Sequence, residues 1–432
     1  MHVAIFYLSF YFDLSSLVYI LCAVFAYRCS YNAVAYLYVF SYLFQMIMVF
    51  AVGHIGFMPY LISPAVLIIK GLFLPKRLTP EIKNIQFASC IFVFFVVVQS
   101  IVAKSFFEGD VFVYAESGME TSILKGRVPL KFSMKIIIQW LYLALNMGGL
   151  VSLLKHKHYL KPKFASFVSK NAALFICIIG LWKYVTDNFG GWFPTSFFIN
   201  NISYDAGNTL QSIDGKFRFT ALFHEASVCG IFLACSLWIV YLMQEKQKKL
   251  LLILIICLLL TVSSSGFFAV AFGLFLYLVK SRQLKTLFGC AIMSVLVFYI
   301  IQMLGIGDTV YDMTFNKMQS GSAEVRTTIM RSNLDLFFDT YGWGGGIGST
   351  CAAGLATTLI SQTGWIGTIL FVFWLWTIYK QLKKEQTLIM MLPITVLLFA
   401  MCTSVGYLSY PTMWYVFIIA LTMPKDYLRR KI

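Results

Sequence analysis

The sequence predicts an all-α fold, a polytopic membrane bundle of about 12–14 transmembrane helices in one integral domain over residues 1–432. The first observation is composition, because 59% of the residues are hydrophobic, only 12% are charged and the mean hydropathy is +0.80. Soluble domains carry about 45–50% apolar and about 25% charged residues, whereas lipid removes the need for a polar exterior. The second observation is a series of long apolar runs, and the third is that basic residues cluster between those runs.

The apolar runs predict the spans in order along the chain. Asp13 interrupts the first run, the second and third form a hairpin, and a Ser-Ser-Ser-Gly break at 263–266 divides two short helices. The predicted spans are 3–27, 33–52, 56–74, 85–103, 134–154, 168–186, 219–243, 249–264, 265–279, 286–304, 356–379, 387–404 and 410–423.

The basic clusters predict the orientation. They occur at Arg28, 76–83, 155–170, 246–249, 280–285, 380–384 and 425–431. Short cytoplasmic loops are enriched in Lys and Arg, so these clusters belong to one side, with the C-terminus inside and the N-terminus outside. This placement explains the net charge of +16 without a nucleic-acid partner. Three long segments then lie outside, at 104–133, 187–217 and 305–355, where function is expected.

The first candidate site begins at the end of the second long segment. If the run is helical from its start, Arg218 and Glu225 share one face, with Glu225 about 10 Å deeper. An ionisable group inside a span normally faces a cavity or a partner. The blander interpretations are that Arg218 is an interfacial anchor and that His224, which lies off that face, is a packing or hydrogen-bonding residue.

The second candidate site is an amphipathic helix over 324–339, on the membrane surface. It carries Arg326 and Arg331. Because Glu324, Arg331 and Asp335 have helical spacing, a simple row of ion pairs is the alternative interpretation.

A glycine-rich segment follows at 342–349. Its glycines, Gly346 and Gly348 among them, allow a tight turn and close backbone approach to a ligand. The segment lacks the Walker lysine and is not flanked by strand and helix, so a nucleotide site is not expected. The ten cysteines show no CxxC or metal spacing, and neither a metal nor a cofactor is expected.

Arginines at an outer face have a definite chemical use. A guanidinium binds phosphate bidentately and stays charged in a low-dielectric site. Arg218 and Arg326 converging on one cavity suit a diphosphate, whose developing negative charge fixed cations stabilise when it leaves. A carboxylate such as Glu225 can orient or deprotonate an acceptor hydroxyl. His224, Arg331, Gly346 and Gly348 complete the set as substrate-binding candidates.

Three stretches resemble the Wzy-type bacterial polysaccharide polymerases, which are related to the O-antigen ligases. They are RFTALFHEAS at 218–227, LTVSSSG at 260–266, and 326–349 followed by LISQTGWIG at 359–367. Ala221 and Ala226 replace the glycine and proline usual in the first stretch. Arg331 and Gly342 fit an Arg-x10-Gly spacing described for these polymerases.

The resemblance implies a GT-C-like membrane fold in the bacterial inner membrane, with the active site facing the periplasm. It implies transfer of a growing glycan from undecaprenyl diphosphate to a new lipid-linked repeat unit, in O-antigen or capsule biosynthesis. The implied partners are the lipid-linked donor and acceptor, membrane lipid, a chain-length regulator and a flippase.

Two other functions stay open. The first is O-antigen ligase, although ligases place a histidine where this chain has Ala353. The second is a flippase or transporter of lipid-linked glycans. Transporters are commonly built from internal repeats, and no such duplication is evident in the sequence.

Overall fold

The computed structural model describes residues 10–11, 13–52, 55–115, 119–200, 212–213, 215–245, 247–283 and 321–428. Within these ranges, four helices are long and apolar enough to cross a membrane. They are α4 (Pro80–Phe107), α6 (Met134–Lys155), α7 (Phe164–Phe189) and α15 (Leu355–Lys384). The chain is therefore an α-helical membrane protein, as its composition predicts.

Shorter apolar helices make up the rest of the described bundle. They are α1 (Leu14–Cys29), α2 (Tyr31–Ser41), α3 (Pro59–Leu72), α9 (Ala226–Leu242), α10 (Lys248–Leu260), α11 (Ser264–Lys280), α16 (Met391–Ser404) after the 3-10 turn η4 (Leu388–Met390), and α17 (Pro411–Thr422). Side-chain caps start several of them: Asp13 accepts from the Ser16 amide, and Ser263 accepts from the Gly266 amide. The predicted span 286–304 lies outside the described residues.

The predicted span 33–52 is wrong. Helix α2 ends at Ser41, and the chain continues to a short strand β2 (Phe50–Val52). The Ser41 hydroxyl donates to the Tyr38 carbonyl and the Gln45 amide donates to the Tyr42 carbonyl. Polar side chains therefore satisfy the last helical carbonyls, and the hydrophobic run does not continue as a helix.

Small elements occupy the segments between the apolar helices. Strand β2 pairs antiparallel with β1 (Phe10–Tyr11) and β3 (Ile55–Phe57), so the described fold is not purely helical. The remaining elements are β4 (Phe112–Val113) with β5 (Val128–Pro129), β6 (Ser212–Ile213) with β7 (Lys216–Phe217), α5 (Met119–Lys125), α8 (Thr195–Phe198), α14 (Gly321–Asp339), η1 (Lys157–Tyr159) and η5 (Lys425–Tyr427).

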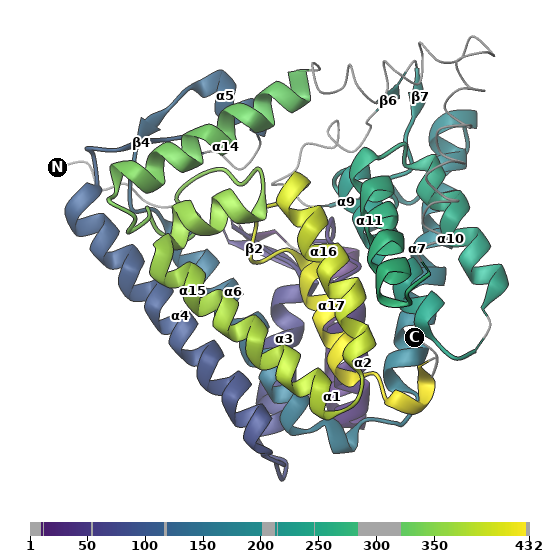
Figure 1. The fold of residues 1–432 in the computed structure, drawn as a ribbon. Helices are drawn as coiled ribbons and strands as arrows, with labels where there is room; N and C mark the ends of the chain where they lie inside the picture. Colours follow the sequence, from purple (N-terminus) through teal and green to yellow (C-terminus); the bar gives the residue numbers. More distant parts are fainter. Residues whose placement is uncertain are drawn as a thin grey trace.

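The helices pack around a continuous apolar core. Helices α4 and α15 lie side by side along one flank, while α7, α9, α10 and α11 form the other (Figure 1). Helix α17 lies between them and is buried along its whole length. Trp374 of α15 packs on Trp414 and Phe417 of α17, with ring centroids 5.9 and 5.1 Å apart.

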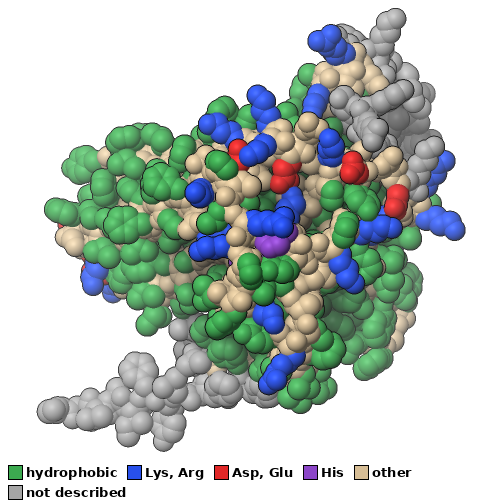
Figure 2. Space-filling model, turned by 90° about the horizontal axis from the view of Figure 1, so that it is seen from below, with side chains coloured by type: hydrophobic (Ala, Val, Ile, Leu, Met, Phe, Trp, Pro, Cys, Tyr) green, Lys and Arg blue, Asp and Glu red, His purple; other side chains and the backbone are tan. Residues whose placement is uncertain are grey.

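The basic clusters gather at one end of the bundle, here called the basic end. Figure 2, a view from below, shows Lys and Arg side chains spread over this face with few acidic ones. Ion pairs join clusters that are distant in sequence: Lys157 Nζ lies 2.6 Å from Glu385 Oε2, and Lys384 Nζ lies 2.5 Å from Glu81 Oε2. Lys170 pairs with Glu245 in the same way. The clusters around Glu81, 155–170, Glu245 and 380–385 therefore lie together at one end, as predicted.

The predicted amphipathic helix is α14, and it lies at the opposite end of the bundle (Figure 1). On α14 itself, Ile329 and Leu336 are fully buried on the face toward the bundle, whereas Asp335 and Phe338 are exposed. Helix α14 packs against α5, β4 and α15. The first and third predicted outer segments thus contribute to one assembly above the bundle.

Candidate functional site

The segment from Arg218 to Glu225 is a turn, not a helix. Helix α9 begins only at Ala226, with Glu225 in an extended conformation at its N-cap. Ala221 has a positive φ of 50°, and Phe219 fills the space beside Gly180 of α7 so tightly that a Cβ there would lie 2.2 Å from its ring. The prediction that Arg218 and Glu225 share a helix face is therefore wrong, because tertiary packing of the aromatic side chains outweighs the apolar periodicity.

Arg218 is anchored to the hairpin between α10 and α11. Its Nε donates to the Thr261 carbonyl and its Nη2 to the Val262 carbonyl, both at 2.9 Å. These carbonyls lie just past the C-terminus of α10, where backbone acceptors lack helical partners. Arg218 is thus a positioned side chain and not a freely snorkelling anchor. Burial lowers the pKa of its guanidinium, Glu225 opposes that shift and Arg326 adds to it.

Glu225 lies between a hydroxyl and a guanidinium. Its Oε2 accepts from the Ser227 hydroxyl at 2.7 Å and lies 4.0 Å from Nη2 of Arg326. Burial acts to raise the pKa of Glu225, but His224, the Ser227 hydroxyl and the two arginines outweigh it and hold the pKa below its ordinary value. Glu225 is therefore a carboxylate at neutral pH.

Arg326, on the first turns of α14, completes the site. Its side chain is about a quarter exposed at 23%, yet its Nε is buried and has no hydrogen-bond partner among the described residues. A guanidinium carries five N–H donors, and the exposed part of this one is accessible to an anion. Arg218, Glu225 and Arg326, here called the Arg–Glu cluster, come from two distant segments and share one electrostatic environment.

The cluster lies away from the basic end. At its other end, α9 meets the C-terminal segment, where the Gln244 amide donates to the Tyr427 carbonyl at 2.8 Å. The 17 residues of α9 separate that contact from Glu225, which at about 1.5 Å per residue is about 25 Å.

The other predicted binding residues differ in placement. His224 is half-buried beside Glu225; burial lowers its pKa and Glu225 opposes that shift. Arg331 is exposed one turn beyond Arg326 and forms no ion pair within the described part of the chain. The alternative of an ion-pair row along α14 is wrong, because Asp335 lies 3.7 Å from Arg127 instead.

The glycine-rich segment is a packed turn. Gly346 donates to the Gln362 carbonyl, and Gly348 donates to the Gln362 side chain, both at 3.0 Å. Both glycines have positive φ, and a Cβ on Gly348 would lie 2.7 Å from Gln139. The close approach expected of these glycines is to other helices, and their amides already have protein acceptors.

Sequence reasoning missed the polar residues that hold this end together. Gln99 of α4 donates to the carbonyls of Trp343 and Gly344 at 2.9 and 2.8 Å. Gln362 of α15 donates to the carbonyl of Thr350, at the end of the same glycine-rich turn. Both glutamines interrupt apolar runs. A polar side chain within a predicted span was the available sign, because such groups are expensive in lipid and face the interior.

Among the residues that the structure describes, no group of three or more His, Cys, Asp or Glu side chains is placed to hold a metal ion. The Arg–Glu cluster supports recognition of an anion by fixed guanidinium groups beside a carboxylate. No known family profile matches the chain, and comparison with curated proteins gives no match.

Proposed function

We propose that the protein is a glycosyltransferase of the Wzy polymerase type, acting at the periplasmic face of a bacterial inner membrane. In this proposal it moves a growing glycan from undecaprenyl diphosphate to a new lipid-linked repeat unit, building O-antigen or capsule. The observation that carries the proposal is the Arg–Glu cluster. Nη2 of Arg326 lies 4.0 Å from Oε2 of Glu225, the Nε of Arg326 has no hydrogen-bond partner among the described residues, and Arg218 lies nearby.

The proposed reaction needs no external energy source. The acceptor hydroxyl oxygen forms a bond to the anomeric carbon of the donor, and the bond from that carbon to the diphosphate oxygen breaks. Undecaprenyl diphosphate leaves with the electron pair, and the hydroxyl proton passes to water or to the leaving group. Fixed guanidinium groups stabilise the charge that grows on the diphosphate.

Glu225 suits orientation of the acceptor better than removal of its proton. A carboxylate whose pKa is held below the ordinary range is a weak base, whereas it remains a good hydrogen-bond acceptor. Glu225 also holds Arg326 in place. The proposal therefore assigns Glu225 to positioning.

Two other functions remain as alternatives, O-antigen ligase and flippase. Ala353, at the place of the ligase histidine, is fully buried and its side chain supplies no polar group. A flippase needs a polar route through the bundle, whereas α17 fills the centre with buried side chains. These observations favour the polymerase.

The proposal predicts the effect of removing either guanidinium. Arg326→Ala or Arg218→Ala should abolish long chains while single repeat units still reach the cell surface, because donor activation is lost but export is not. The measurement is the chain-length ladder of surface polysaccharide from a deletion strain complemented with each variant. Lys131→Ala, which removes an exposed charge outside the cluster, is the control and should give the normal ladder.

Two results would count against the proposal. Normal ladders in both arginine variants would remove the Arg–Glu cluster from the chemistry. Loss of the single-unit band in the deletion strain would instead indicate a ligase or a flippase.

A further inference from the structure

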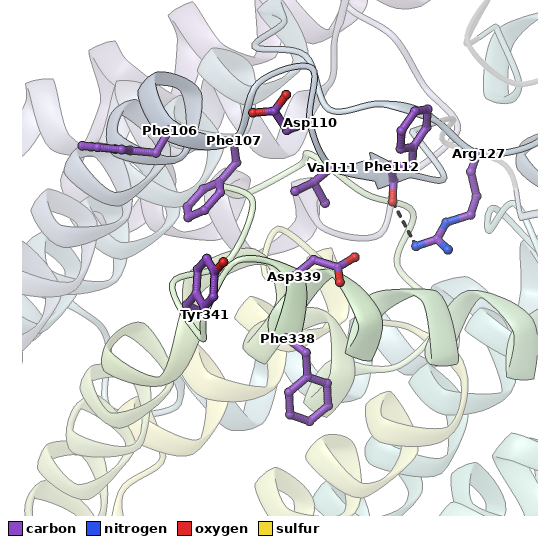
Figure 3. A pocket seen from close by; sticks show the side chains of 9 residues that line it. All are labelled: Phe106, Phe107, Asp110, Val111, Phe112, Arg127, Phe338, Asp339 and Tyr341. Atoms are coloured by element: carbon purple, nitrogen blue, oxygen red, sulfur yellow. Dashed lines mark hydrogen bonds between the residues drawn. The ribbon is translucent and has the colours of Figure 1, made fainter.

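A second site lies at the far end of α14 from the Arg–Glu cluster. It is an open groove of about 660 Å³, formed where the end of α4, the β4–β5 hairpin and the end of α14 meet. Figure 3 shows its lining side chains, which are Phe106, Phe107, Asp110, Val111, Phe112, Arg127, Phe338, Asp339 and Tyr341. A volume of this size accommodates a ligand of several rings.

The groove combines exposed aromatic faces with free acceptors. Phe106, Phe338 and Tyr341 are 70%, 69% and 90% exposed, so their ring faces are accessible to a ligand. The side-chain carboxylates of Asp110 and Asp339 form no hydrogen bond or ion pair with any other described residue. An aromatic ring packs on an apolar ligand face, while an ionised carboxylate only accepts hydrogen bonds.

The charges of the groove select the class of ligand. Its only cation among the lining residues is Arg127, whose guanidinium donates to the Phe112 carbonyl at 3.1 Å and lies 3.7 Å from Asp335 (Figure 3). Two uncompensated carboxylates repel phosphate and disfavour an acyl chain. A neutral ligand with many hydroxyl donors and apolar C–H faces satisfies both the carboxylates and the rings, and a carbohydrate is such a ligand.

We infer that this groove binds the oligosaccharide part of the lipid-linked substrate, at a fixed distance from the reacting diphosphate. Arg326 and Asp339 are 13 residues apart on α14, which at about 1.5 Å per residue is about 20 Å. One rigid helix therefore joins diphosphate recognition to glycan recognition. The inference rests on the proposed function, because the glycan is the cargo of that reaction.

Direct binding tests the inference without relying on activity. The probe is repeat-unit oligosaccharide released from the surface polysaccharide of the host, titrated by NMR saturation transfer into the purified full chain in nanodiscs. The double variant Phe338→Ala, Tyr341→Ala should weaken binding by about tenfold, a loss of about 1.4 kcal/mol, because it removes two aromatic contacts. Asp339→Asn, which keeps the shape, should weaken binding as well.

Matched variants separate the possible outcomes. Phe189→Ala removes an equally exposed phenyl ring at the end of α7, and it should bind the oligosaccharide as the wild type does. The inference would be overturned if the wild type did not bind the oligosaccharide, or if the groove variants bound it as well as the wild type does. It would also be overturned if polyprenyl phosphate, and not unlabelled oligosaccharide, displaced the bound probe. If the groove variants lose binding while Arg326→Ala still makes long chains, the proposed reaction fails and the glycan groove stands.

Discussion

Glu225 is the residue whose environment has the clearest consequence for pH dependence. Its pKa in the folded protein is held below the ordinary value of 4.5. A depressed folded pKa means that the interactions of this carboxylate stabilise the fold above the unfolded pKa and are lost as the pH falls through the folded value. In the proposed reaction Glu225 acts as a carboxylate. Its protonation should therefore lower the transfer rate only below pH 4.5.

Ser227→Ala tests that expectation. The Ser227 hydroxyl donates to Glu225 at 2.7 Å and lowers its pKa, so its removal should shift the acid limb of the rate profile to higher pH. The measurement is the pH dependence of transfer by purified protein in nanodiscs. Ser105→Ala, at an exposed serine on α4, should leave the profile in place, and an unshifted limb in Ser227→Ala would exclude Glu225 as the titrating group.

At the residue scale, the sequence predicts which side chains carry the chemistry but not what holds them. Arg218 and Glu225 are evident because charges are rare in this chain and both fall in one motif. The acceptors of Arg218 are the backbone carbonyls of Thr261 and Val262. Every residue has a carbonyl, so no side-chain pattern identifies those two.

Among the elements, α15 depends on one glycine. Gly364 interrupts it with φ 68° and ψ −174°, and a Cβ there would lie 2.3 Å from the Trp343 carbonyl oxygen. Gly364→Ala should therefore sharply lower the thermal stability of the purified protein. Gly190→Ala is the matched control, since Gly190 has φ 82° and ψ 162° but open space around it, and it should cost only backbone strain of about 1–3 kcal/mol. A similar loss in both variants would show that packing at Gly364 is unimportant.

The long helices were predictable because their apolar runs are long and carry few charged residues. The observed helices contain the predicted spans 85–103, 134–154, 168–186 and 356–379. Some of these helices extend beyond the apolar run into polar sequence, as α4 does to its N-cap Thr79. The failures at 33–52 and 218–225 have a shared cause. In both, apolar side chains pack against other helices while the backbone turns, and hydropathy records burial without recording conformation.

The whole molecule has one basic end, and its orientation in the membrane is testable. Lys131→Cys and Lys383→Cys place thiols at exposed positions, one in the first long outer segment and the other at the basic end. A membrane-impermeant maleimide should label Lys131→Cys in intact spheroplasts and Lys383→Cys only after permeabilisation, measured against the wild-type background. The reverse pattern would place the Arg–Glu cluster on the cytosolic side and would contradict the proposal that it acts on a substrate at the periplasmic face.

The enclosure of α17 has a consequence for biosynthesis. With 12 residues, all buried, this helix is too short to cross a bilayer alone and touches no lipid once in place. Every other described α-helix precedes α17 in the chain, so those helices are synthesised before the side chains that fill the space between them. Chains that lack α17 would expose the apolar surface that it covers, and quality-control proteases should degrade them.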